Sequence, residues 1–84
     1  MGMPLPNTRF QKADALIGQR IRLLRHASGI SAQEMARISG MEISDYASCE
    51  IGEARYSATE LFEIARGLKV GLSDIFGVLR NASD

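Results

Sequence analysis

A small residue at position 36, a glycine at 40 and an apolar residue at 46 constrain this chain more than any other feature. Ala36 allows two helices to cross closely, because a larger side chain would push them apart. Gly40 suits a tight turn, since a positive φ costs glycine little. Tyr46 is the next inward-facing position. Residues 32–51 are therefore predicted to form two short helices joined by a tight turn, a helix-turn-helix.

The remainder of the chain also has helical periodicity. Apolar residues recur three and four positions apart, and no segment of four or more residues alternates as a strand would. Five helices are predicted, over about 14–27, 32–39, 43–50, 58–68 and 72–79. The fold class is all-α.

Two of these predicted helices begin with a serine that is followed three residues later by a glutamate, which is the pattern of a capping box. The pairs are Ser31 with Glu34 and Ser57 with Glu60.

With 84 residues, the chain has room for one domain. We expect a flexible N-terminal arm over 1–13, a helix-turn-helix domain over 14–79 and a C-terminal tail over 80–84. One cysteine and one histidine exclude an internal disulfide and make a four-ligand zinc site improbable, so no cofactor is expected. Without a signal peptide or an apolar run that could span a membrane, the protein is expected to be cytoplasmic.

Four stretches resemble the phage repressor/Cro-type helix-turn-helix domains, also called the XRE family. They read IGQRIRLLRHASGIS, QEMARISGM, CEIGEARYS and LFEIARGLKVGLSDIF, and the resemblance covers about residues 15–77. It implies a five-helix, lambda-repressor-like DNA-binding domain. Members are usually dimeric transcription regulators that bind double-stranded DNA and place the third helix in the major groove.

The resemblance also implies roles for single residues. Arg25 and Glu50 match positions that form a structural ion pair between the first and third helices. Arg55 matches a position that contacts the DNA backbone. Lys69 stands where relatives often have a glycine after the fourth helix, and a positive φ there would strain it.

Charge is distributed unevenly along the chain, although ten basic and ten acidic residues give a net charge of zero. Residues 1–28 carry five basic side chains and one acidic one, whereas residues 29–64 carry two basic and seven acidic ones. The outward positions of the predicted third helix include no Arg, Lys, Asn or Gln, the residues best suited to reading guanine or adenine. They are Glu42, Ile43, Ser44, Asp45, Ala47 and Ser48.

DNA binding would therefore depend on contacts with phosphates, supplied by basic side chains and by the start of the second helix. The candidate DNA-binding residues are Ala32, Gln33, Arg37, Glu42, Ile43, Ser44, Asp45, Ser48 and Arg55. Further phosphate contacts are expected from Arg9, Lys12, Arg20 and Arg22.

Two functions remain open at this stage. The first is a small, sequence-specific transcriptional regulator that binds DNA as a homodimer. The alternative is a protein-interaction module on the same fold, of the antitoxin or anti-repressor type, whose acidic third helix faces a protein partner. No pattern of a catalytic triad, phosphate loop or metal cluster is present, so the sequence predicts no enzyme. The dimer interface is predicted at Ile75, Val78 and Leu79, where apolar surface extends beyond what the core needs.

Overall fold

The computed structural model describes residues 8–82, and this part of the chain is all-helical. Five α-helices are followed by a short 3-10 helix, η1, which confirms the predicted all-α, five-helix fold. The elements are α1 (Thr8–Ala27), α2 (Ala32–Ser39), α3 (Ile43–Glu50), α4 (Ala58–Leu68), α5 (Leu72–Phe76) and η1 (Gly77–Ala82).

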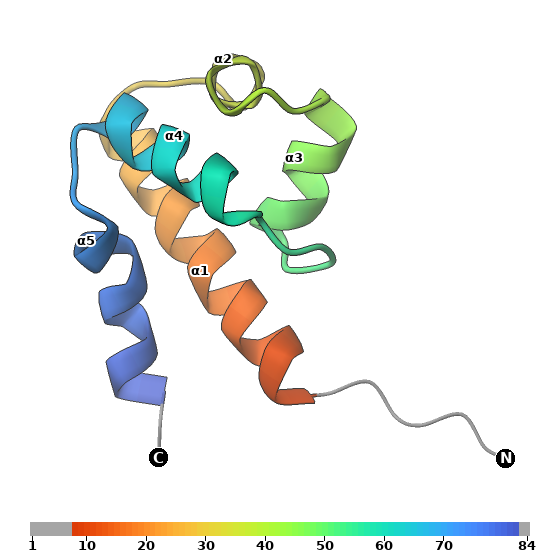
Figure 1. Ribbon diagram of the computed structural model, residues 1–84, viewed down its shortest axis with the longest axis vertical. Coiled ribbons are helices and arrows are strands. Elements are labelled where there is room, and N and C mark those ends of the chain that lie inside the picture. The colour runs from red at the N-terminus through yellow and green to blue at the C-terminus, as the bar shows by residue number, and fades with distance from the viewer. Residues whose placement is uncertain (1–7, 83–84) are drawn as a thin grey trace, which may run out of the picture.

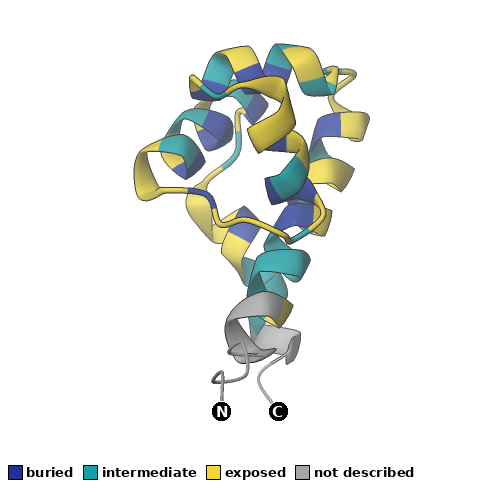
Figure 2. Ribbon diagram, turned by 90° about the vertical axis from the view of Figure 1, so that its right-hand side faces the viewer, coloured by how far each residue is buried: buried dark blue, intermediate teal, exposed yellow. Residues whose placement is uncertain are grey.

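The long helix α1 forms the spine of the molecule (Figure 1). It packs against α3 on one side and against α5 and η1 on the other, while α2 packs against α3 and α4. Buried positions of the five α-helices face a common interior (Figure 2). The side chains that are completely buried there are Ile21, Met35, Tyr46, Ile64 and Ile75.

The helix-turn-helix lies where the spacing predicts it. Gly40 ends α2 in the left-handed region with a φ of 75°, and its N–H donates to the carbonyl of Arg37. No atom within 4 Å would contact an added Cβ at Gly40, so backbone conformation alone demands glycine there. Ala36 and Tyr46 are both buried, as the close crossing of α2 and α3 requires.

One of the two predicted capping boxes is complete. The Ser57 side chain accepts from the Glu60 N–H at 3.1 Å, and the Glu60 carboxylate accepts from the Ser57 N–H at 2.8 Å. At the start of α2, the Ser31 hydroxyl accepts from the Glu34 N–H at 3.0 Å. The second half of this box is replaced, because the Glu34 carboxylate accepts from Arg37 one turn later.

The ends of the domain differ from the prediction. Helix α1 begins at Thr8 instead of residue 14, since the segment after Pro6 contains no glycine or proline and has several good helix formers. The expected last helix over 72–79 is divided, with α5 ending at Phe76 and η1 following from Gly77. Phe76, the last residue of α5, is 37% exposed.

Two further features follow from the helix ends and lengths. Lys69 ends α4 with a φ of 60°, so the strain expected at this residue is present. Within residues 8–82, no helix combines the length and the apolar character needed to cross a membrane.

Candidate nucleic-acid interface

The buried ion pair implied by the resemblance holds α3 against α1. Arg25 Nε donates to Glu50 Oε2 at 2.6 Å, and Arg25 Nη2 donates to Glu50 Oε1 at 3.2 Å. The two side chains are only 10% and 9% exposed. Arg25 Nη1 also donates to the Ile30 carbonyl at 2.8 Å, and the Tyr46 hydroxyl donates to Glu50. One guanidinium thus connects α1, the loop before α2, and α3.

The pKa values of this cluster favour its charged form. The hydrogen bond to Glu50 raises the pKa of Arg25 above its usual value. Burial opposes the charge on Glu50, but hydrogen bonds from Arg25 and Tyr46 outweigh it, so the pKa of Glu50 lies below its usual value. Burial first, and then the hydrogen bond to Glu50, raise the pKa of the Tyr46 hydroxyl. At neutral pH, Tyr46 therefore remains a donor to an ionised carboxylate.

Two glycines bring α1 close to the end of α3. A Cβ added at Gly18 would lie 2.3 Å from the Glu50 carbonyl oxygen, and one at Gly52 would lie 2.7 Å from the Ala15 Cα. Gly52 also has a positive φ of 86°. Sequence reasoning missed Gly18, because only the packing of α1 on α3 explains a glycine inside a helix.

Most of the outward face of α3 is exposed, as the sequence predicts. Successive residues of an α-helix are rotated by about 100°, which places Ser44 and Ser48 near the centre of this face. Ser48 is half-buried. Ile43 and Ala47 lie on one flank, and both are exposed. Asp45 lies on the opposite flank. The apolar and acidic residues therefore occupy different sides of the helix.

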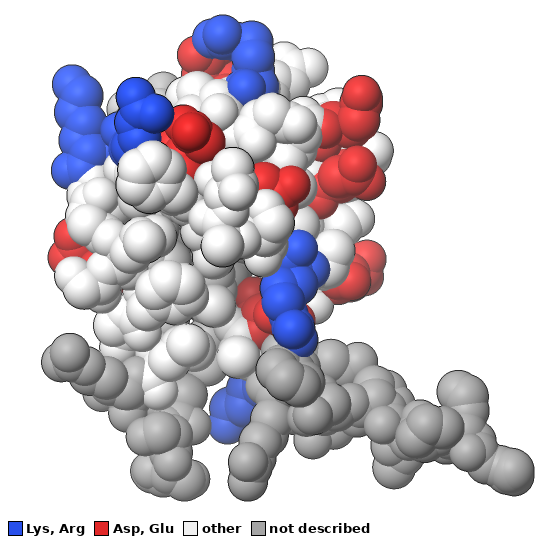
Figure 3. Space-filling model, in the orientation of Figure 1, with Lys and Arg blue, Asp and Glu red and all other residues white. Residues whose placement is uncertain are grey.

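The acidic flank of α3 faces the start of α4. Glu42 and Asp45, together with Glu60 and Arg55, line a hollow of about 480 Å³ there. Acidic side chains gather along the edge of the molecule that α3 occupies (Figure 3). Cys49 also lines this hollow but is buried, and burial raises the pKa of its thiol to about 11, so it remains protonated at neutral pH.

The basic candidate residues beside α3 have acidic neighbours. Arg37 is exposed and pairs with Glu34 within α2. Arg55 Nε lies 3.2 Å from an Asp14 carboxylate oxygen. In the first turn of α2, Gln33 is exposed, whereas Ala32 is half-buried against the core.

Of the additional basic candidates, Lys12 and Arg22 are exposed and Arg20 is partly buried. The side chain of Arg9 lies outside the part that the structure describes.

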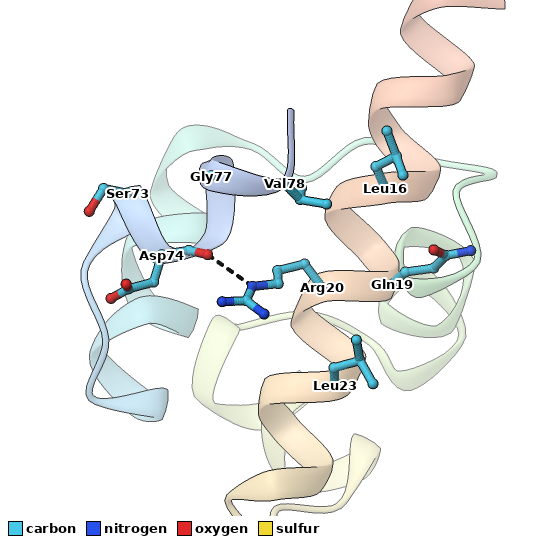
Figure 4. A pocket seen from close by; sticks show the side chains of 8 residues that line it. All are labelled: Leu16, Gln19, Arg20, Leu23, Ser73, Asp74, Gly77 and Val78. Carbon is cyan, nitrogen blue, oxygen red and sulfur yellow. Dashed lines mark hydrogen bonds between the residues drawn. The ribbon is translucent and has the colours of Figure 1, made fainter. Parts of the chain in front are cut away.

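The predicted dimer surface needs one correction. Ile75 is completely buried among the chain's own helices, so it is not available to a second copy. Val78 and Leu79 are half-buried, on an element that packs against α1. Beside them lies a groove of about 430 Å³ between α1 and the α5–η1 segment, lined in part by Leu16, Leu23 and Val78 (Figure 4).

The sequence matches the family described as "Helix-turn-helix domain" over residues 16–75, which includes all of α2 through α4. The protein belongs to this family. Together with the relatives below, the match identifies the domain as the phage repressor and Cro type, confirming the resemblance seen in the sequence. In this chain, the second helix of the motif is α3.

Two proteins are similar to this helix-turn-helix chain. An "uncharacterized transcriptional regulator in ATPase CF(0) region" from Rhodospirillum rubrum is 35% identical over 78 residues, which are 92% of this chain and 72% of that protein. The crystal structure of the restriction-modification controller protein C.AhdI from Aeromonas hydrophila superposes with a TM-score of 0.70 at 30% identity. That match covers 75% of this chain and 96% of the controller protein.

Proposed function

We propose that this protein is a transcriptional regulator that binds duplex DNA through α3. The observation that carries the proposal is that the inward and outward faces of α3 differ in their contacts. Its inward residues Tyr46 and Glu50 are fixed by buried contacts, while its outward face is left to solvent. An exposed helix on a rigid support is what insertion into a major groove requires. Both similar proteins are named as regulators or controllers, not as enzymes.

Contacts with phosphates would supply most of the affinity in this proposal. Gln33 and the backbone N–H groups at the start of α2 are candidates for such contacts, because helix N-termini bind phosphates through free N–H groups. Arg37 and Arg55 would exchange a carboxylate partner for a phosphate. Ser44 and Ser48 would make the polar contacts with bases, and serine reads bases with little discrimination.

We further propose that the protein acts in the cytoplasm as a homodimer. The groove beside Val78 has exposed leucine surface from Leu23 on α1, and Leu72 and Phe76 on α5 are also partly exposed. In such a dimer, the two α3 helices would need to lie about 34 Å apart to enter successive major grooves.

The test is binding of the intact chain to random duplex DNA over a range of salt concentrations. A regulator should lose affinity steeply with salt, because phosphate contacts release counterions. Arg55→Gln should weaken binding to all sequences about equally and reduce the salt slope by about 1. Arg66→Gln is the matched control, since Arg66 is also exposed and paired with a carboxylate, Glu63. Salt-independent affinity, or an equal effect of both variants, would count against the proposal.

The acidic flank of α3 supports the alternative function, an interaction module with a protein partner. Glu42 and Asp45 would repel phosphates that come within a Debye length of about 8 Å. Their conversion to Gln and Asn should therefore strengthen nonspecific DNA binding in a regulator. If these variants bind no DNA and instead lose a protein partner that the parent chain binds, the alternative is correct.

A further inference from the structure

The outward face of α3 limits which chemical groups of DNA it can recognise. Between Glu42 and Ile51 it has no Arg or Lys, which donate two hydrogen bonds to guanine, and no Asn or Gln, which donate to and accept from adenine. Two carboxylates there can only accept, and they line the hollow toward α4. The serines offer single hydroxyl groups. Polar recognition of purines is therefore poorly supported by this helix.

Apolar recognition is better supported. Ile43 is 42% exposed at the first position of α3 and is not part of the core. Ala47 follows one turn later on the same flank and is also exposed. N-terminal residues of a recognition helix contact base edges, so Ile43 stands where such contacts are made. The thymine 5-methyl is the apolar group that the four bases present in the major groove.

We propose that the Ile43–Ala47 flank of α3 reads thymine through its 5-methyl group. This inference rests on the proposed function and names the chemical group that α3 would recognise. The flank carries no charge, whereas the acidic flank lies on the other side of the helix. The DNA half-site would then contain thymine at one or two adjacent positions. Thymine would be distinguished from the other bases by burial of its methyl group and not by paired hydrogen bonds.

Deoxyuridine provides the test, because it removes only the 5-methyl group and keeps the base pairing. The intact chain first selects duplexes from a random pool, and each thymine of the selected half-site is then replaced in turn. A buried methyl is worth about 0.8 kcal/mol, so we expect affinity to fall about fourfold at one or two positions.

Two variants test whether Ile43 is responsible for this loss of affinity. In Ile43→Ala, the thymine-to-uracil affinity ratio at the affected position should fall to about one. Ile51→Ala is the matched control, because Ile51 is 61% exposed at the opposite end of α3 and should keep the fourfold ratio.

The outcomes separate the inference from the proposed function. If a selected sequence is bound but contains no thymine, or if uracil never changes its affinity, the inference is wrong and the regulator proposal stands. If no duplex is selected from the pool, both fail.

Discussion

Replacing Arg25 with methionine tests whether the buried ion pair holds α3 in place. The change removes two hydrogen bonds to Glu50 and one to the Ile30 carbonyl, while keeping an unbranched side chain of similar length. Glu50 would remain 91% buried beside the Tyr46 hydroxyl, without its countercharge. An unpaired charge in such a place is expensive, since burial removes its hydration.

The expected loss is about 3–5 kcal/mol of unfolding free energy, the range seen when one partner of a buried pair is removed. A chain of this length is stable by about 4–13 kcal/mol in total, so the variant should be close to unfolding. Replacing both partners, in Arg25→Met/Glu50→Leu, removes both buried charges. This double variant should therefore be more stable than Arg25→Met alone.

Urea denaturation followed by circular dichroism at pH 7 measures these free energies for a double-mutant cycle. We expect the two substitutions to couple by about 2 kcal/mol or more. The Arg66→Gln variant serves as a control, because its surface pair with Glu63 should contribute less than about 1 kcal/mol. Additive effects of the Arg25 and Glu50 substitutions, within about 0.5 kcal/mol, would refute the reasoning.

Three more predictions follow from the backbone and the buried carboxylate. Lys69→Gly should raise the unfolding free energy by about 1 kcal/mol, seen as a higher melting temperature, because glycine adopts the φ of 60° without strain. Gly18→Ala should lower it by about 1–3 kcal/mol despite the better helix propensity of alanine, and an increase would mean that α1 and α3 are not packed this closely. The depressed pKa of Glu50 gives stability that is present above pH 4.5 and is lost as pH falls through the folded pKa. Urea midpoints measured from pH 7 to 3 should thus fall less steeply for Glu50→Gln than for the parent chain.

Local spacing made the centre of the fold predictable. The turn at Gly40 and the inward position of Tyr46 depend on residues fewer than ten positions apart, so sequence alone places them. The exposure of α3 followed in the same way from helical periodicity. Contacts between residues far apart in the sequence were not predictable in this way. A glycine is needed at position 18 because the backbone of Glu50, 32 residues later, packs against it. The Arg25–Glu50 ion pair was expected only from the family resemblance.

The candidate interface was predicted less completely than the fold. Periodicity showed that Glu42 and Asp45 are outward-facing, but the position of α4 decides that they line a hollow away from the apolar flank. The last helix was extended too far in the prediction, because Val78 and Leu79 continue its apolar pattern beyond Gly77. Burial of Ile75 then depended on how α5 packs, which the pattern itself does not specify.

The residues that hold α3 in the domain are different from the residues on its outward face. Its hold on the domain comes from Tyr46, Cys49 and Glu50, and from backbone close to α1. Within the part of the chain whose side chains the structure describes, the side chains at 43, 44, 47 and 48 make none of the hydrogen bonds that fix the helix. New residues at these four positions would alter what the helix touches and leave its support intact. If α3 reads DNA as we propose, its sequence preference could change, by evolution or by design, with little effect on the stability of the domain.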